Sequence, residues 1–470
     1  MLVLTALLAL TQSSVTVGAY WELRQALASA KPGTTVYLKP GEYSGGFQVE
    51  NLQGAPGKPI VIAGQDPKNP PKILNGGIHL VASSYVEIRD LYVVGTERNG
   101  NGINVDDGGV REKPSHHITL RRITSTDFGT PISCGIKMAG VNDFAILDCD
   151  VRNYDEGIDL VGCHDGLIEN CRLEKGGGVG VQAKGASARV TVRQCKFKDF
   201  GERGVNMGGS TGDPFFRPPF ETIAAGKRYE SKDIRVEGCT FEGGTAPVAY
   251  INSDGAVVRY NTIVNPSRWA IRILQETPRP DFHPSRNGTF SRNIVVFRSD
   301  RWFEGGVNIG PNTAPSTFKF EDNFWFCVDR VERSNPSLPT VEARPIIGRD
   351  PQLTDWTKAT SPSSREARQW LTGRRRSERA PTSLPNEGAR APRAWLWVRH
   401  RERFRHGFRS AGGATRRTAR SLEPETVAPR LRAGGSSPRA GPRSRIGKWR
   451  APARAGVARG SKGPHGRLPE

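Results

Sequence analysis

The chain lacks the sequence features that mark several large classes of protein. It contains no phosphate-binding glycine loop, and its adjacent histidines, His116 and His117, have no third ligand at metal spacing. Its most apolar run, Leu2 to Leu10, is far shorter than a membrane span. We therefore expect no P-loop chemistry, no metal site at the two histidines and no membrane-spanning segment.

That short apolar run has the length of a signal-peptide core, and it predicts a signal peptide over residues 1–14. Cleavage near Ser13 is one expectation, and Val17-Gly18-Ala19 fits a later site. The run implies a secreted, cell-surface or periplasmic protein.

The positive charge is confined to one end of the chain. Residues 356–470 hold 28 Lys and Arg against 7 Glu, so the remaining residues hold 40 charges of each sign and the net charge of +21 belongs to this tail. The tail is rich in Arg, Gly, Pro and Ser and has no periodicity that could bury a core. We interpret it as a disordered or wrong-frame tail, with a small folded domain as the alternative. For the folded part we expect no nucleic-acid partner.

A four-residue phrase recurs eight times: a small residue, an aliphatic residue, a variable residue and another apolar residue. Such alternation predicts a half-buried strand whose variable residue points outward. Recurrence at a near-fixed interval predicts one strand in each coil of a solenoid. The copies begin at Gly102, Gly135, Gly157, Gly180, Gly204, Pro247, Ala270 and Gly306.

A second repeat runs in step with the first and contains four of the seven cysteines. Its marked positions are Cys149, Cys171, Cys195, Cys239, Asn261, Asn293 and Asn323, at steps of 22, 24, 44, 22, 32 and 30 residues. The unit is therefore about 22 residues, with insertions chiefly at 213–230 and 277–286. We expect a buried stack of thiols that passes into stacked asparagines, not a disulfide framework.

These repeats resemble those of the right-handed parallel β-helix superfamily, the pectate-lyase-like fold. The opening is also similar, because Leu23, Ala26, Leu27 and Ala30 lie at helical spacing and can cap the first coil. The resemblance implies an all-β, single-stranded right-handed parallel β-helix over residues 15–355 with a short N-terminal capping helix. The superfamily includes lyases, hydrolases, epimerases and non-catalytic adhesins, so the resemblance does not select an activity.

The outward residues of successive coils should form a single column on the surface. A column of amides and a few charges suits an extended polysaccharide, which repeats along its length as the coils do. The insertions contain Phe215, Phe216, Phe220 and Phe282, which can stack on sugar rings or pack over the coils. The predicted substrate-binding residues are Asn104, Gln182, Arg203, Asn206, Trp269, Gln275 and Asn308.

The densest charged patch suggests β-elimination of an acidic, uronate-containing glycan. This reaction needs a base near the C5 proton and a cation beside the substrate carboxylate. We expect Lys137 or Lys184 to be the base, Asp159 to pair with Lys137, and Arg272 to neutralise the carboxylate. Tyr154, Asp155, Glu156 and His164 are placed on flanking loops. A Ca²⁺ site is predicted at Asp106, Asp155 and Asp159.

Two other functions remain open. A glycoside hydrolase could pair the Asp159 carboxylate with that of Asp106 or Glu156. A non-catalytic extracellular carbohydrate-binding protein would need only the column. The sequence shows neither the paired aspartates of polygalacturonases nor the calcium-cluster and arginine signatures of pectate lyases. We expect a monomer.

Overall fold

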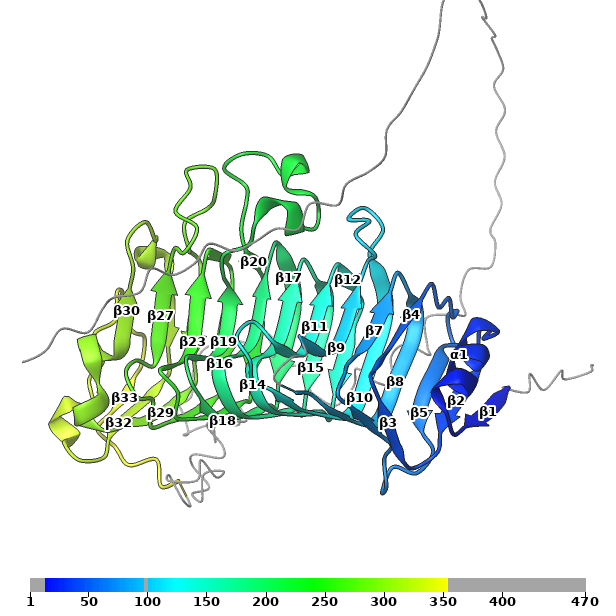
Figure 1. Ribbon diagram of the computed structural model, residues 1–470. Helices are drawn as coiled ribbons and strands as arrows, with labels where there is room; N and C mark the ends of the chain where they lie inside the picture. The colour runs from blue at the N-terminus through cyan, green and yellow to red at the C-terminus, as the bar shows by residue number, and fades with distance from the viewer. Residues whose placement is uncertain (1–12, 97–99, 354–470) are drawn as a thin grey trace, which may run out of the picture. The chain divides into compact units, whose positions relative to one another are not determined.

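The computed structural model describes residues 13–96 and 100–353. Over these residues the chain winds into a parallel β-helix, in which each coil stacks on the one before it (Figure 1). The all-β, single-stranded β-helix prediction is therefore confirmed. Most of the predicted signal peptide and all of the Arg-rich tail lie outside the described residues. No helix within the described ranges is long and apolar enough to cross a membrane.

One set of strands carries the outward residues of the first repeat, and we call it the column ladder. Its strands are β4 (Phe47–Glu50), β7 (Ile78–Val81), β9 (Asn101–Asp106), β11 (Cys134–Ala139), the second half of β14 (Asp150–Val161), the second half of β16 (Arg172–Lys184), β19 (Arg203–Gly208), β23 (Ala246–Ile251), β27 (Ile271–Leu274) and β30 (Val307–Ile309).

Two further ladders complete each coil. The second ladder contains β1 (Ser14–Val17), β2 (Thr35–Leu38), β5 (Ile60–Gly64), β8 (Ser84–Val94), β10 (Ser115–Phe128), β12 (Val141–Asn142), β13 (Ala145–Leu147), β15 (His164–Glu169), β17 (Ser187–Arg193), β20 (Ser231–Lys232), β21 (Arg235–Glu237), β24 (Ser253–Asp254), β25 (Val257–Arg259), β28 (Thr289–Ser291) and β31 (Lys319–Glu321). The third contains β3 (Glu42–Ser44), β6 (Lys72–Leu74), β18 (Lys196–Phe200), β22 (Thr240–Glu242), β26 (Thr262–Val264), β29 (Ile294–Phe297), β32 (Phe324–Cys327) and β33 (Ile346–Ile347), with parts of β8, β10, β14 and β16. Short 3₁₀ turns are η1 (Asp213–Phe215), η2 (Phe220–Thr222), η3 (Ser299–Arg301), η4 (Phe303–Gly306), η5 (Pro315–Thr317) and η6 (Val331–Arg333).

The outward residues of the column ladder pair across coils in one register. Lys137 pairs with Asp159, and Asp159 pairs with Gln182, so the predicted vertical order is confirmed. The inward neighbours, such as Ile136 and Ile158, are fully buried and fix this register, because a slip of one residue would expose them. In coil order, the column consists of Gln48, His79, Asn104, Lys137, Asp159, Gln182, Asn206, Ala249, Arg272 and Asn308.

A short helix covers the first coil, as predicted. Helix α1 (Tyr20–Ala28) turns Leu23 and Leu27 into the core, and the Glu22 carboxylate accepts hydrogen bonds from the backbone N–H groups of Gly18 and Ala19. Strand β1 begins at Ser14, one residue before the predicted start of the β-helix domain. The helix thus keeps water from one end of the apolar core.

The predicted stack of thiols and asparagines is present inside the coils. All seven cysteines are free and buried. Asn261 Nδ2 donates to Asn293 Oδ1 at 2.9 Å, and Asn293 Nδ2 donates to Asn323 Oδ1 at 3.0 Å. Glu342 ends the stack, because its Oε1 accepts from Asn323 Nδ2 at 2.7 Å. Every buried amide in this stack therefore has a partner.

The corner before each member of this stack is left-handed, and glycine is not its usual residue. Asp148, Asn170 and Gln194 precede the first three cysteines of the stack with φ of 56°, 54° and 56°. Gly238 is the only glycine at this corner position in the stack. Asp and Asn tolerate this conformation better than most residues, because their short side chains bond locally. This series of corners is thus largely polar, whereas Gly140, Gly162 and Gly185 occupy left-handed corners elsewhere in the coils.

The two predicted insertions rise together beyond the ends of the column-ladder strands (Figure 1). Phe216 and Phe220 of the first pack against Phe282 of the second. Arg217 reaches back to Asp107, with Nε to Oδ2 at 2.7 Å and Nη2 to Oδ1 at 2.9 Å, and the pair is buried. The insertions therefore form a fixed wall beside the column ladder.

Candidate functional site

The middle of the column is a buried carboxylate held between two ammonium groups. Asp159 Oδ2 lies 2.7 Å from Lys137 Nζ, and Asp159 Oδ1 lies 3.3 Å from Lys184 Nζ. The Asp159 side chain is 0 % exposed, whereas those of Lys137 and Lys184 are 32 % and 18 % exposed. The prediction of an exposed column is therefore wrong at Asp159, because the two lysines lie over it.

The charges of this group stabilise one another. Burial raises the pKa of Asp159, but the positive charges of Lys184 and Lys137 outweigh burial and hold that pKa below the ordinary value. Burial lowers the pKa of Lys137, but the Asp159 charge outweighs it and raises that pKa above the ordinary value. Lys137 is thus held as an ammonium ion, which disfavours the predicted role of Lys137 as a base.

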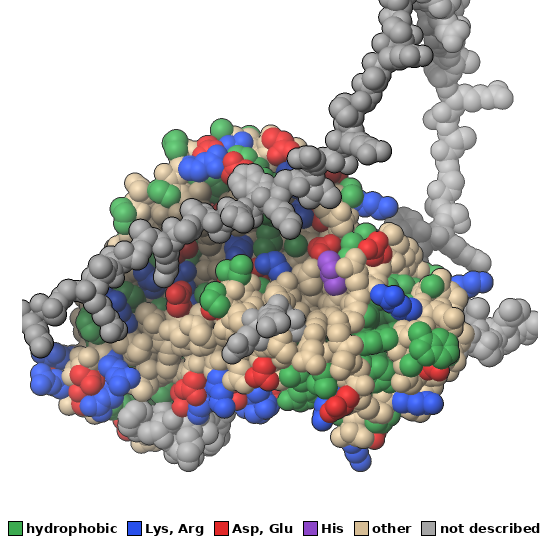
Figure 2. Space-filling view, in the orientation of Figure 1, with side chains coloured by type: hydrophobic (Ala, Val, Ile, Leu, Met, Phe, Trp, Pro, Cys, Tyr) green, Lys and Arg blue, Asp and Glu red, His purple; other side chains and the backbone are tan. Residues whose placement is uncertain are grey.

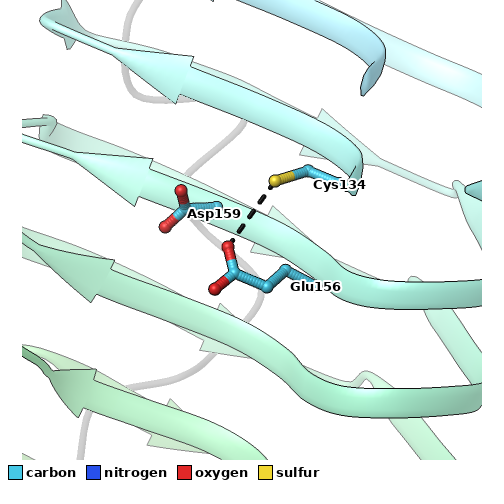
Figure 3. A group of neighbouring side chains, drawn as sticks. All are labelled: Cys134, Glu156 and Asp159. Atoms are coloured by element: carbon cyan, nitrogen blue, oxygen red, sulfur yellow. Dashed lines mark hydrogen bonds between the residues drawn. The ribbon is translucent and has the colours of Figure 1, made fainter. Parts of the chain in front are cut away.

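A second carboxyl group, Glu156, lies beside this centre. Figure 3 shows Glu156 and Asp159 on one strand and Cys134 on the strand before it. The Cys134 thiol donates to Glu156 Oε2 at 3.6 Å, and ligand atoms of Cys134, Glu156 and Asp159 all lie within 4.8 Å of one another. Burial, followed by the nearby negative charge of Asp159, raises the pKa of Glu156.

The other residues predicted on flanking loops lie in strands. Tyr154 and Asp155 belong to β14, and the Tyr154 ring points into the core, where burial raises its pKa. Asp155 accepts a hydrogen bond from the Ile132 backbone N–H at 2.6 Å. His164 begins β15 and bonds Asn142 and the Ala186 carbonyl. None of these three side chains joins the centre.

A chain of amides continues the column beyond the charged centre. Gln182 Nε2 lies 3.4 Å from Asp159 Oδ1, and Asn206 Nδ2 donates to Gln182 Oε1 at 2.8 Å. Arg203 Nη1 donates to Asn206 Oδ1 at 3.2 Å and Nη2 pairs with Glu276 at 2.7 Å. Gln182 and Asn206 are buried, so these predicted binding residues hold their neighbours in place and offer a ligand little surface.

Arg272 lies several coils away from Lys137 and Lys184 along the column. Between β16, which carries Lys184, and β27 there are three coil steps, which amounts to about 14 Å at the usual strand spacing. From Lys137 the separation is five steps, about 24 Å. The C5 proton and the carboxylate of a uronate belong to one sugar, so this spacing does not favour the predicted role of Arg272 beside either lysine.

Arg272 belongs instead to a separate cluster near the end of the column. Its Nε donates to Asn308 Oδ1 at 3.0 Å, and its guanidinium lies over the Trp269 ring at 4.7 Å. Arg268 lies over the same ring at 4.2 Å, and Trp269 is 6 % exposed. Trp269 therefore has no open face for the predicted sugar contact, whereas Asn308 and Arg272 remain partly exposed.

The insertions use most of their polar and aromatic groups internally. Gln275 Nε2 donates to the His283 carbonyl at 2.9 Å, and its Oε1 accepts from the Ser285 N–H at 2.8 Å. Gln275 thus secures the wall and is not free to bind a ligand. Phe216 and Phe220 are buried in the packing between the loops, so they do not serve as sugar platforms.

The predicted calcium ligands do not form one site. Asp106 is two coils from the Asp159 coil; its carboxylate contacts His79 Nε2 at 2.6 Å and the Gly108 N–H at 2.9 Å. The Asp155 carboxylate accepts a hydrogen bond from the Ile132 backbone N–H. The Asp159 carboxylate faces two ammonium groups, which would repel Ca²⁺. These three carboxylates are engaged separately and do not fit a single calcium site.

Two members of the column precede the residues identified from the repeat. Gln48 and His79 extend it, and the imidazole of His79 bridges Gln48 Oε1 at 3.2 Å and Asp106 Oδ2 at 2.6 Å. The sequence contains the signal for them, because Gly77 begins a further copy of the four-residue phrase and Gly46 begins a copy with Phe47 in the aliphatic position. Gln48 is exposed, and His79 and Asn104 are partly exposed.

The winding, the stacked interior and the column place the protein in a known class: it is a right-handed parallel β-helix protein. The family model described as "Right handed beta helix region" matches residues 75–216. No curated protein sequence matches the chain.

Several solved structures are similar. The alginate lyase from Paenibacillus sp. str. FPU-7 is 16 % identical, with a TM-score of 0.46 over 63 % of this chain and 99 % of that one. Pectate lyase Pel9A is 13 % identical, with a TM-score of 0.40 over 63 % and 73 %. The GH136 lacto-N-biosidase from Eubacterium ramulus is 13 % identical, with a TM-score of 0.44 over 65 % and 63 %.

Proposed function

We propose that this is a secreted or periplasmic protein that binds an acidic, uronate-containing polysaccharide along the column and cleaves it by β-elimination. The observation that carries the proposal is the layered charge of the centre. Asp159 lies underneath with no exposed surface, and the ammonium groups of Lys137 and Lys184 lie above it. A ligand that approaches the column here meets positive charge first.

The surroundings of the centre also favour an anionic ligand. Basic side chains lie on the face between the insertions and the strands of the column ladder, with acidic side chains among them (Figure 2). The insertions form one wall, held by the buried pair of Arg217 and Asp107. Successive coils offer side chains about 4.8 Å apart, a spacing that suits a repeating polymer laid across them.

The two lysines fit the electrostatic requirement of elimination. Removal of the C5 proton moves negative charge onto the substrate carboxylate, and fixed cations stabilise that charge best where water is excluded. We assign this role to Lys137 and Lys184, in place of Arg272. Asp159 is a positioning residue, because it holds both ammonium groups and cannot reach a ligand itself.

Hydrolysis by paired carboxylates fits the centre less well. A retaining or inverting hydrolase needs two carboxyl groups that reach the sugar or a water. Glu156 is partly exposed, but Asp159 is fully buried and neutralised by two lysines. Of the two carboxyl groups, only that of Glu156 is therefore accessible to a sugar or a water molecule.

A screen of purified protein with pectate, alginate and glycosaminoglycans tests the proposal. Elimination creates a conjugated double bond, so the expected result is a rise in ultraviolet absorbance with at least one acidic glycan and none with a neutral glycan. New reducing ends without that absorbance would identify a hydrolase. Binding without any product would identify a non-catalytic carbohydrate-binding protein.

A further inference from the structure

Elimination needs a group that moves the C5 proton, and the lysines do not supply it. Lys137 is held as an ammonium ion by Asp159, and Lys184 contacts the same carboxylate at 3.3 Å. Asp159 itself is fully buried. The centre must therefore contain another proton-transfer group if it carries out the proposed reaction.

Glu156 is placed to be that group. It lies three residues before Asp159 on β14, and its ladder partners are Cys134 on one side and Val179 on the other. Its side chain is partly exposed, and among the described residues it has no ion pair. The one hydrogen bond recorded for its carboxylate comes from the Cys134 thiol. A carboxyl group in this position is partly open to a ligand and forms no ion pair with another described residue.

Resting on the function proposed above, we propose that Glu156 is the catalytic residue that removes the C5 proton of the bound uronate. The Glu156 carboxylate takes the proton, and the electron pair of the C5–H bond is delocalised into the substrate carboxylate. That pair then forms the C4–C5 double bond as the C4–O4 bond breaks with its own electron pair on O4. Glu156 returns the same proton to O4, so no further reactant is needed.

The charged and titratable neighbours of Glu156 set the pH at which it can act as a base. Asp159 lies on its own strand, Lys137 and Cys134 lie on β11, and Lys184 lies on β16. Burial and Asp159 raise the pKa of Glu156, while the two lysines and the thiol hydrogen bond lower it, and the net shift is upward. A base whose pKa lies closer to neutral pH is more effective than an ordinary carboxylate.

Replacement of Glu156 tests its role directly. We expect Glu156→Gln to lower kcat for elimination by about 10²- to 10⁴-fold with little change in KM. Glu202→Gln is the matched control, since Glu202 is an exposed carboxyl two coils further on, and it should keep wild-type kinetics. An active wild type with an equally active Glu156→Gln variant overturns the role of Glu156 alone. A wild type that eliminates no acidic glycan overturns the proposed function and this inference together.

The contact with Cys134 gives a second readout that a purely structural role would not move. Cys134→Ala removes the thiol donor, so the pKa of Glu156 should rise and the acid limb of the kcat profile should shift to higher pH. Cys134→Ser keeps a donor and should keep the limb near its wild-type position. Identical acid limbs for Cys134→Ala and wild type would contradict the assignment, whatever their absolute rates.

Discussion

Replacement of Asp159 by asparagine measures how strongly the centre is held together. Asn keeps the shape of the side chain and the contact with Gln182 but removes the charge that faces Lys137 at 2.7 Å and Lys184 at 3.3 Å. Loss of one partner of a buried ion pair lowers the free energy of unfolding by about 3 to 5 kcal/mol. Both lysines are partly exposed and can turn toward water, so we expect a loss of about 2 to 4 kcal/mol.

Urea denaturation of both proteins, followed by circular dichroism, measures this difference. The matched control is Asp165→Asn, because Asp165 also makes two contacts, with Arg189 at 2.7 Å each, but at an exposed position. An exposed pair contributes about 0 to 1 kcal/mol. If Asp165→Asn destabilises as much as Asp159→Asn, burial is not what makes the centre strong and the reasoning is refuted.

Comparison of wild type with Asp159→Asn also predicts how stability depends on pH. The pKa of Asp159 is lower in the folded protein than in the unfolded chain, where an aspartate titrates near pH 3.9. Its stabilising effect is therefore complete above the unfolded value and is lost as the pH falls through the folded value. We expect the part of the stability difference that comes from the Asp159 charge itself to be constant from neutral pH to about pH 5 and to shrink only below that.

Four further outcomes are expected. Lys184→Ala should lower kcat on an acidic glycan by about 10²- to 10³-fold, measured by the same absorbance assay, and an unchanged kcat would remove its role as a neutralising cation. Arg217→Met leaves the Asp107 carboxylate buried without its partner and should lower the free energy of unfolding by about 3 to 5 kcal/mol in urea titrations; a loss below 1 kcal/mol would show that the wall is not anchored there. Asn293→Ala removes the acceptor of Asn261 Nδ2 and should lower the thermal midpoint, whereas an unchanged midpoint would contradict the stacked amides. Activity should survive dialysis against EDTA, and its loss with recovery on adding Ca²⁺ would restore the calcium prediction.

The register of the column can be predicted from the sequence because each outward residue is fixed by its inward neighbours. Ile136 and Ile158 must face the core, which leaves Lys137 and Asp159 on the other face of their strands. The same logic predicts the asparagine stack, since buried amides at one position of each coil lie above one another and need partners, which they find in each other and in the backbone.

The burial of each side chain and its contacts with neighbouring residues cannot be predicted in this way. Asp159 is buried because Lys184 of the following coil reaches back over it, and no local pattern encodes that reach. Trp269 and Gln275 are residue types that often bind sugars. In the structure, however, two arginines cover the Trp269 ring, and the Gln275 amide is hydrogen-bonded within the second insertion. Glu156 is predicted on a flanking loop, whereas β14 continues through it.

Titration calorimetry of a soluble oligouronate against wild type and the Lys137→Ala, Lys184→Ala double variant tests the central claim most directly. The two ammonium groups above the buried Asp159 should supply much of the attraction, so the double variant should bind at least tenfold more weakly, and wild-type binding should weaken as salt is added. Equal affinity of the two proteins, or binding of a neutral oligosaccharide as tight as that of the oligouronate, would contradict the account.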